Sequence, residues 1–397
     1  MKTFTSRPVI LQVLPTLDAG GVERGTIEMV QAIAEAGGLP LVASAEGRLV
    51  PKVTYYGGRH IPLDLGRKSP LAILRNAIRL KSIIASEGVS LVHARSRAPA
   101  WAAKLACRRK KTPFVTTWHG VHNENFPGKK AYNAVLSEGD RVIAISNFIA
   151  DRLKRDYGVN DERLRTIPRG ADTLQFDPEA VRGERVRAVL ESWNIDDDGA
   201  AIILMPARLT EWKGQGLLLD ALAIMQREQW TTRPWVCVLV GSAPKKSGFP
   251  NTLEAQAREL GIASHIRFGG HCSDMPAALA LSEMIVVPSL RPEPFGRVVV
   301  EAQAMARPVI VAAHGAAMET VRHGETGLLF PPGDARALAE MIAATLEASV
   351  EQRMALGLAA RENVLAHYTT RSMQQATLGV YDELLGTTLV VNRAATP

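Results

Sequence analysis

The sequence contains few cysteines and few aromatic residues. The three cysteines, Cys107, Cys237 and Cys272, lie far apart and are odd in number, so their spacing indicates neither a disulfide framework nor a metal site. This scarcity fits a reducing compartment, and we expect a cytoplasmic protein. Aromatic residues make up only 5% of the chain. No aromatic stacking motif or zinc spacing accompanies the basic residues, which argues against nucleic acid as a partner.

Long apolar runs are also missing. No stretch approaches the roughly 20 residues that cross a bilayer. The apolar run Val9–Leu14 is short and lacks a cleavage-site pattern, so it predicts a strand rather than a signal peptide. With 46% hydrophobic and 22% charged residues the composition is that of a globular protein, and 397 residues suit two domains.

Acidic residues are nearly absent between Arg67 and Lys130, where 14 lysines and arginines are accompanied only by Glu87 and Glu124. This segment therefore carries +12, which leaves −5 for the rest of a chain whose net charge is +7. A one-sided basic region favours an anionic partner, such as a membrane surface or lipid phosphates. We expect the cluster Arg108–Lys111 to contribute to a membrane contact. The alternative is a solvated basic face without a partner.

The most informative stretch follows Met284–Val287, an apolar run that predicts a buried parallel strand. Pro292 and Pro294 exclude a helix immediately after it, Gly296 allows a tight turn, and a helical pattern then begins. A strand–loop–helix unit directs backbone N–H groups and the positive end of a helix toward one point. Anionic oxygens bind well at such a point.

Two glutamates flank this predicted anion site, Glu293 in the loop and Glu301 in the helix. A carboxylate repels an anion, so we expect both side chains to accept hydrogen bonds from hydroxyl groups instead. An anion site beside hydroxyl-binding acids indicates a nucleotide sugar as the ligand.

The segment Glu293–Glu301, with its Pro-Phe-Gly core, resembles the Glu-x7-Glu signature of retaining glycosyltransferases of family 4, which have the GT-B fold. The segment Arg208–Gly214 resembles a second phrase of that family, in which two cations hold the diphosphate. The resemblance extends from Gly20 to about Leu385. It implies an α/β protein of two doubly wound Rossmann-like domains that face a central cleft.

The resemblance also suggests how the chain divides. We expect an acceptor-side domain over residues 1–178, a nucleotide-sugar domain over 179–370, and a helix over 371–390 that crosses back to the first domain. The tail from Val391 is expected to be disordered. Two positions depart from the family pattern, because Arg169 stands where asparagine is usual and Ala316 stands where a second glycine is common.

The expected catalytic residues are Arg208 and Lys213, which would hold the diphosphate, Glu293, which would bind the transferred sugar, and His119, which would orient that sugar. His119 precedes a glycine at the end of a predicted strand over Pro113–Thr117 and resembles the family's Thr-x-His-Gly turn. His271 either contacts the ligand or only occupies a turn. Further donor contacts are expected from Gly20, Gly21, His271, Phe295, Gly296 and Glu301, together with Arg208 and Lys213.

Candidate acceptor residues are Arg95, Arg97 and His122. The two arginines follow a predicted strand over Val89–His93, and open α/β sheets bind ligands at that end of their strands. An ordinary surface loop is the alternative. The loop His122–Lys130 is polar and basic, which makes it a candidate gate for the acceptor.

The resemblance implies a retaining hexosyltransferase that uses a nucleoside-diphosphate-sugar, and we expect a UDP-sugar rather than a GDP-sugar. The expected acceptor is a glycan or a lipid-linked molecule of lipopolysaccharide core or other surface polysaccharide synthesis, reached at the inner face of the cytoplasmic membrane. No metal or other cofactor is expected, because two cations can neutralise a diphosphate. The alternatives are a GT-B sugar-nucleotide epimerase and a two-lobed binding protein without catalysis.

Overall fold

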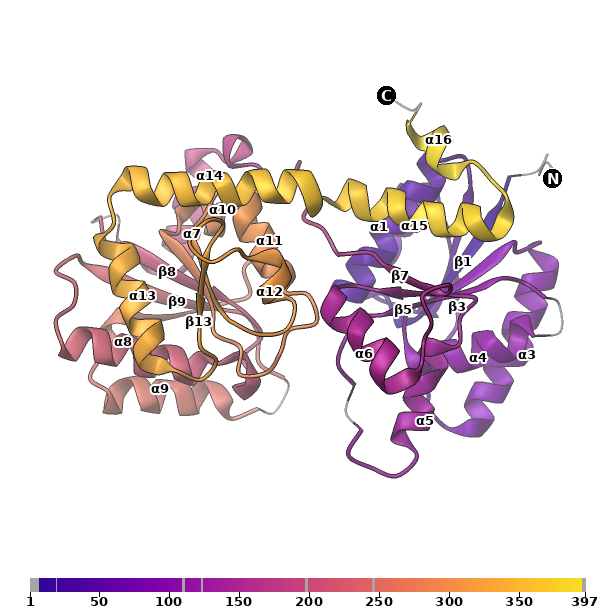
Figure 1. Ribbon diagram of the computed structural model, residues 1–397, viewed down its shortest axis with the longest axis horizontal. Coiled ribbons are helices and arrows are strands. Elements are labelled where there is room, and N and C mark those ends of the chain that lie inside the picture. Colours follow the sequence, from indigo (N-terminus) through magenta and orange to yellow (C-terminus); the bar gives the residue numbers. More distant parts are fainter. Residues whose placement is uncertain are drawn as a thin grey trace. The chain divides into compact units, whose positions relative to one another are not determined.

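The computed structural model describes residues 7–18, 20–108, 111–122, 124–196, 199–244 and 247–394. The chain forms two compact units, which are drawn in Figure 1. Unit 1 contains residues 1–169 and 370–397, and unit 2 contains residues 170–369. The first crossing between the units therefore follows Arg169, earlier than the boundary expected after residue 178.

Unit 1 is built on seven parallel strands in the order β3-β2-β1-β4-β5-β6-β7. The five inner strands are short, mostly apolar and buried runs, as expected for strands covered on both faces, whereas the edge strands β3 and β7 are partly exposed. The strands are β1 (Val9–Thr16), β2 (Leu39–Ala45), β3 (Arg59–Pro62), β4 (Leu91–Ala94), β5 (Phe114–Trp118), β6 (Arg141–Ala144) and β7 (Leu164–Thr166).

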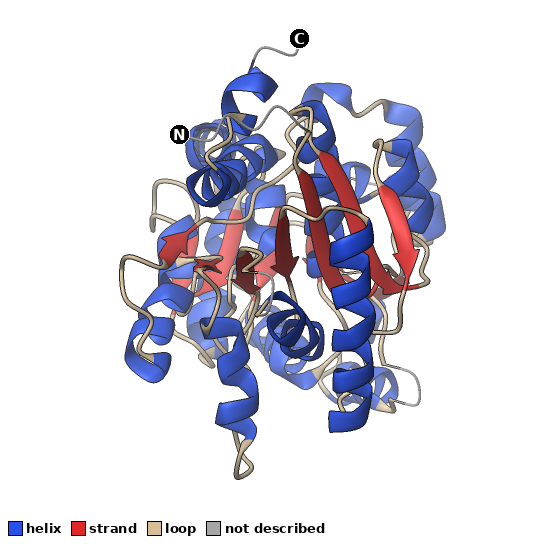
Figure 2. Cartoon of the chain, turned by 90° about the vertical axis from the view of Figure 1, so that its right-hand side faces the viewer, coloured by secondary structure: helices blue, strands red, loops and turns tan. Residues whose placement is uncertain are grey.

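Helices lie on both faces of this sheet (Figure 2). One face is covered by α1 and α15, where Met29 and Tyr381 pack with Ile10 of β1. The helices are α1 (Gly21–Glu35), α2 (Val50–Tyr55), α3 (Pro70–Ser86), α4 (Arg97–Cys107), α5 (Lys129–Asn133), α6 (Asn147–Tyr157), α15 (Thr370–Leu385) and α16 (Leu389–Ala394), with the 3-10 turn η1 (Ala134–Ser137).

Unit 2 repeats the design with six parallel strands in the order β10-β9-β8-β11-β12-β13. They are β8 (Ala201–Pro206), β9 (Trp235–Val240), β10 (Ile266–Gly270), β11 (Met284–Val287), β12 (Val309–Ala312) and β13 (Leu328–Phe330). On one face Ile203 packs with Leu218 and Leu222 of α8 and with Leu338 and Ile342 of α13.

The helices of unit 2 are α7 (Gly183–Ser192), α8 (Gln215–Arg227), α9 (Phe249–Glu259), α10 (Met275–Leu281), α11 (Arg297–Ala304), α12 (Ala317–Thr320), α13 (Ala335–Glu347) and α14 (Val350–His367). The 3-10 turns are η2 (Pro178–Ala180), η3 (Glu211–Lys213) and η4 (Ala263–His265). Within the described ranges, no helix of either unit combines the length and the apolar character that crossing a membrane requires.

Both sheets reverse their strand order at one point, between β1 and β4 in unit 1 and between β8 and β11 in unit 2. Open α/β sheets bind ligands outside the carboxyl ends of the strands at such a switch point. In unit 2 the loops that leave β8 and β11 are residues 207–214 and 288–296. The sheet topology therefore indicates the same two loops as candidate ligand-binding segments that the sequence motifs indicated.

Several local predictions were wrong. Arg97 is the first residue of α4 rather than a loop residue, because Pro99 is tolerated in a first helical turn. The start of the second expected domain contains α7, a helix that the sequence patterns did not predict, which buries Val189 and Leu190. The expected tail begins inside α16, where Leu389 is 1% exposed, while residues 395–397 lie outside the described part.

Residues 324–326 form a turn that leads into β13. Leu328 pairs with Ile310 and Phe330 pairs with Ala312, so β13 adds to the sheet in parallel with β12. Ala316 is in the right-handed helical region with φ −71°, so the absence of a second glycine produces no strain there.

Candidate active site

The loops that follow β8 and β11 are joined to each other. The backbone N–H of Leu290 donates to the carbonyl of Trp212 at 2.8 Å. Gly214 has φ +83°, and a Cβ at this position would lie 2.0 Å from the carbonyl oxygen of Pro288. Only glycine satisfies both the backbone angle and the close approach. The sequence Lys-Gly at 213–214 therefore fixes one loop against the other.

Lys213 and Glu293 meet where these two loops join. The Nζ of Lys213 is 2.5 Å from Oε1 of Glu293, and the hydroxyl of Ser289 donates to the same oxygen at 2.6 Å. The side chains of Lys213 and Glu293 are only 18% and 12% exposed, so solvent screens this ion pair weakly. Lys213 Nζ also lies 4.4 Å from the centroid of the Trp212 ring. The structure thus brings two of the predicted catalytic residues into contact.

A third loop, which follows β12, holds the backbone of Glu293. The N–H of Ala316 donates to the carbonyl of Glu293 at 3.0 Å. Gly315 has φ +61°, and a Cβ there would lie 2.6 Å from that carbonyl oxygen. Nε2 of His314 is 2.8 Å from the carbonyl oxygen of Ser289, and burial lowers the pKa of this histidine. Sequence motifs did not mark Ser289 or His314, because their role depends on contacts between loops.

The remaining predicted donor residues of unit 2 differ in burial. Arg208 is exposed at the end of β8, and no carboxylate among the described residues pairs with its side chain. Phe295 is 4% exposed and its ring centroid lies 6.1 Å from that of Tyr368. Gly296, with φ +79°, immediately precedes α11, which no side chain caps. The start of α11 therefore has the form of an anion site.

Glu301 lies on the second turn of α11 and is 4% exposed. Its Oε1 is 3.5 Å from Nε of Arg297, so it belongs to a buried ion pair one helical turn long. His271 is exposed in the loop that follows β10. Contacts of these two residues with a nucleotide remain predictions.

His119 of unit 1 follows β5 and carries a buried nitrogen. Its Nε2 has no hydrogen-bond partner within the part of the chain that the structure describes. Burial, followed by the charges of Arg169 and Arg95, lowers the pKa of His119 well below its ordinary value. The imidazole is therefore neutral near pH 7 and can donate or accept one hydrogen bond at this nitrogen.

The contacts of Arg169 account for the arginine that stands where the family usually has asparagine. Its Nη2 donates to the carbonyl of Gly21 at 2.6 Å. A Cβ on Gly25 would lie 2.2 Å from the guanidinium nitrogens. The arginine therefore fits beside α1 only because residue 25 has no side chain. Near the same turn, a Cβ on Gly20 would lie 2.5 Å from the carboxylate of Glu23. Burial raises the pKa of Glu23, an acid that the sequence motifs did not identify.

Arg95 is not a surface residue, so the surface-loop alternative is wrong for it. The side chain is 4% exposed, and its Nε donates to Oε1 of Gln12 at 2.9 Å. Nearby, Nδ1 of His93 is 2.7 Å from the hydroxyl of Tyr381 on α15. Burial lowers the pKa of Arg95. This arginine therefore lies in a buried polar network between the sheet and α15.

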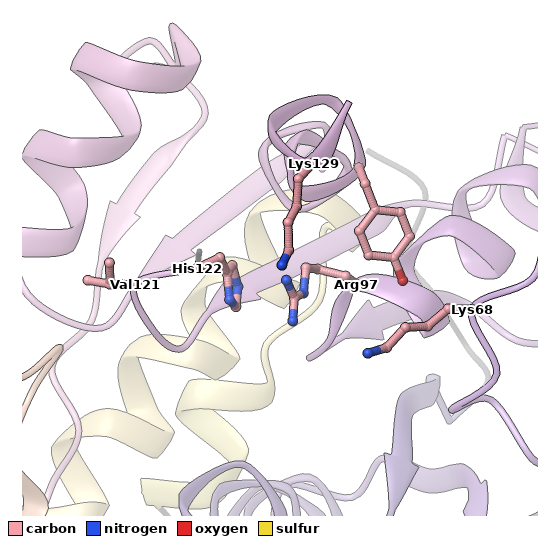
Figure 3. A pocket seen from close by; sticks show the side chains of 6 residues that line it. Lys68, Arg97, Val121, His122 and Lys129 are labelled. Carbon is pink, nitrogen blue, oxygen red and sulfur yellow. The ribbon is translucent and has the colours of Figure 1, made fainter. Parts of the chain in front are cut away.

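Arg97 and His122, the other candidate acceptor residues, line one pocket of about 540 Å³ in unit 1 (Figure 3). Burial, followed by the charges of Arg97 and Arg152, lowers the pKa of His122 to about 4. His122 is therefore neutral near pH 7. The pocket brings these two residues together, whereas Arg95 is not among the residues that line it.

Two doubly wound parallel sheets with motif-bearing loops at their switch points define the GT-B class of glycosyltransferases. A glycosyltransferase from Rickettsia africae has this structure with a TM-score of 0.87 and 34% identity, over 96% of this chain and 100% of that one. The Anabaena protein HepE, solved in complex with UDP-glucose, has a TM-score of 0.81 and 22% identity, over 94% of this chain and 99% of that one.

Sequence comparison gives the same class. Residues 19–175 match the family model Glycosyltransferase Family 4, and residues 191–363 match the model Glycosyl transferases group 1. D-inositol 3-phosphate glycosyltransferase 1 of Catenulispora acidiphila is 29% identical over 83% of this chain and 83% of that protein. The chain therefore belongs to glycosyltransferase family 4, and it is a glycosyltransferase with the GT-B fold.

Proposed function

We propose that the protein transfers a hexose from a UDP-sugar to a glycan or lipid-linked acceptor, with retention of the anomeric configuration. The observation that carries the proposal is the junction of the two switch-point loops of unit 2, where Lys213 contacts Glu293. This junction lies in the segment that contains the start of α11, and it combines a cation, a carboxylate and a helix N-terminus.

In this proposal Arg208 and Lys213 bind the diphosphate. Arg208 supplies a charge that no described carboxylate neutralises, and its planar guanidinium can bind two phosphate oxygens. The backbone N–H groups after Phe295 and Gly296 add donors. Because negative charge grows on the leaving phosphate as the glycosidic bond breaks, these groups lower the barrier without requiring a metal.

Glu293 binds a hydroxyl group of the transferred sugar. Lys213 and Ser289 both contact its Oε1, so its Oε2 can accept from the sugar. Glu301 accepts from the ribose, and the role of His119 stays a prediction, based on its buried and unpartnered Nε2 among the described residues. The acceptor hydroxyl attacks the anomeric carbon from the face that the diphosphate leaves, and the departing phosphate oxygen takes the acceptor's proton.

For the acceptor we propose a lipid-linked molecule of surface polysaccharide synthesis, reached at the cytoplasmic face of a membrane. Helix α3 supports this part. Leu71, Leu74 and Ile78 are 79%, 54% and 64% exposed, and Arg75 and Arg79 lie on the same exposed side. The helix contains no acidic residue. An exposed apolar face with basic neighbours favours an anionic membrane surface. Arg109 and Lys110 of the expected membrane contact lie outside the described residues.

Vesicle binding tests the membrane part. Leu71→Gln with Ile78→Gln should reduce binding to anionic vesicles about tenfold or more, because two large apolar side chains no longer enter the interface. Leu174→Gln with Leu358→Gln removes two exposed leucines of unit 2, which are 88% and 51% exposed, and serves as the control. Equal binding to neutral and anionic vesicles would contradict this part of the proposal.

An activity assay tests the transfer itself. The full chain is supplied with UDP-, GDP- and ADP-sugars, and nucleotide release is measured with and without an acceptor. We expect release from a UDP-sugar and an α-linked product from an α-linked donor. Release from none of these donors would contradict the proposal.

The relatives named D-inositol 3-phosphate glycosyltransferases favour a second acceptor class, a soluble phosphorylated polyol. The same assay distinguishes the two classes by adding either inositol 3-phosphate or a lipid-linked glycan.

A further inference from the structure

The pocket of unit 1 in Figure 3 is formed by four separate segments. Arg97 begins α4, His122 and Val121 lie in the loop after β5, Lys129 and Tyr132 belong to α5, and Lys68 precedes α3. The ammonium ends of Lys129 and Lys68 and the guanidinium of Arg97 point into the same space (Figure 3). Its volume of about 540 Å³ suits a small ligand or a headgroup.

No acid that the structure describes neutralises the three cations of the pocket. Arg97 donates to the neutral amide oxygen of Asn133 at 2.8 Å, and within the described ranges none of the three forms an ion pair. The nearby acids already have cationic partners. Glu124 accepts from Arg152 at 3.2 Å, and Asp64 accepts from Arg67 at 2.8 Å.

Two neutral polar groups complete the lining. The hydroxyl of Tyr132 and Nε2 of His122 are buried, and neither has a hydrogen-bond partner in the described part of the chain. The low pKa of His122 keeps this ring neutral near pH 7, so it can donate to an anion without adding charge. Buried polar groups normally have partners, and their absence here indicates that a ligand supplies them.

We infer that this pocket binds a phosphate group of the acceptor. The inference rests on the proposed transferase function and specifies its substrate as a phosphorylated molecule. Three cations and two neutral donors suit the several oxygens and the charge of a phosphate better than the two oxygens of a carboxylate. The pocket thereby holds the acceptor by a group that takes no part in the reaction, so the attacking hydroxyl can be oriented.

The phosphate has two possible sources, a soluble sugar or polyol phosphate and a lipid headgroup. Inositol 3-phosphate and unphosphorylated inositol are the soluble probes, titrated by calorimetry. Vesicles of phosphatidylcholine with and without phosphatidic acid are the lipid probes. Binding of inositol 3-phosphate but not of inositol, or binding that requires phosphatidic acid, supports the phosphate site. Wild-type protein that binds none of the phosphorylated probes would overturn it.

Charge-removing variants locate the site. Lys129→Gln should weaken binding of the phosphorylated probe about tenfold, as should Lys68→Gln, because each removes one charge-assisted contact. Lys52→Gln removes an exposed lysine of α2 in the same unit and should leave binding unchanged. Equal loss in all three variants, or no loss in the two pocket variants, would overturn the inference.

UDP binding separates this inference from the proposed function. The Lys129→Gln variant should keep the thermal shift that UDP produces in the wild-type protein, since Lys129 belongs to unit 1 and the proposed UDP contacts belong to unit 2. If the wild-type protein shows no UDP shift, the proposed function fails. If the UDP shift is normal and phosphate binding is insensitive to Lys129 and Lys68, only the pocket inference fails.

Discussion

The lysine of the candidate site in unit 2 is paired with a carboxylate, whereas the cations of the pocket in unit 1 are not paired with any described carboxylate. In unit 2, Lys213 contacts the carboxylate of Glu293, which also accepts from Ser289. In unit 1, Lys129 and Arg97 share a pocket in which no described carboxylate neutralises them. A paired cation keeps a defined position and exerts little net field, whereas unpaired cations attract anions. In the proposed function, the first arrangement positions reacting groups and the second recruits a charged substrate.

The largest effect should follow from breaking the paired arrangement. Lys213→Ala should lower kcat/KM for sugar transfer about 10³-fold, because the leaving phosphate loses a charge and Glu293 loses its partner. Arg258→Ala, at an exposed position of α9, is the control and should keep full activity. A Lys213→Ala enzyme that stays folded and retains a tenth of the activity would contradict the assigned role.

The loop junction of unit 2 should be nearly as sensitive. Gly214→Ala should reduce the free energy of unfolding by about 3 kcal/mol, because it combines a left-handed backbone with a clash against Pro288. Gly183→Ala is the matched control, since nothing lies within 4 Å of its added Cβ and it begins helix α7. Urea unfolding measures both, and equal stability of the two variants would show that the junction is not rigid.

Acidification should weaken unit 1 through its buried histidines. The folded-state pKa values of His93 and His119 lie well below 6.5, and that of His122 is about 4. The unfolded chain therefore binds more protons, so stability is fully present above pH 6.5 and is lost as the pH falls. Each histidine contributes up to about 1.4 kcal/mol per pH unit in this window, which for His122 extends down to about pH 4.

Unfolding free energies at pH 7.5, 6 and 5 test this prediction. In the His122→Asn variant, the free energy of unfolding should fall less steeply with decreasing pH, by the slope that corresponds to about one bound proton. A stability that stays constant or rises between pH 7 and pH 5 would contradict the burial of these rings.

The smallest effect should come from the unpaired cations. Lys129→Gln should change the free energy of unfolding by at most about 0.5 kcal/mol, and in the stabilising direction at low salt, because it relieves repulsion within the pocket. Lys213→Gln should instead destabilise the protein, because it leaves the carboxylate of Glu293 without its cation. If both variants destabilise equally, the contrast between paired and unpaired cations is wrong.

The fold was predictable where the sequence carries apolar runs with breaking residues after them. Met284–Val287 followed by two prolines and a glycine predicted β11 and its loop, and the structure has the strand with the same bounds. The edge strand β3, Arg59–Pro62, was missed because three of its four residues lack large apolar side chains. Helix α7 was missed because its charged residues mask a buried face that consists of only two residues.

Sequence motifs named candidate site residues but not the contacts between them. Motifs named Lys213 and Glu293 separately, whereas their pairing depends on how β8 and β11 align, with Ile203 opposite Met284. Only the surface-loop alternative for Arg95 was wrong, because the side chain lies in a buried network with Gln12, and its acceptor role stays a prediction. Long-range contacts of this kind leave no local pattern.

Calorimetric titration of UDP, with GDP and ADP for comparison, tests most directly whether the joined loops of unit 2 bind a nucleotide diphosphate. Wild-type protein is compared with Arg208→Ala and Lys213→Ala. The account predicts that UDP binds the wild-type protein and that each variant binds it at least about tenfold more weakly. Absence of nucleotide binding in the wild-type protein, or equal affinity in all three proteins, would contradict it.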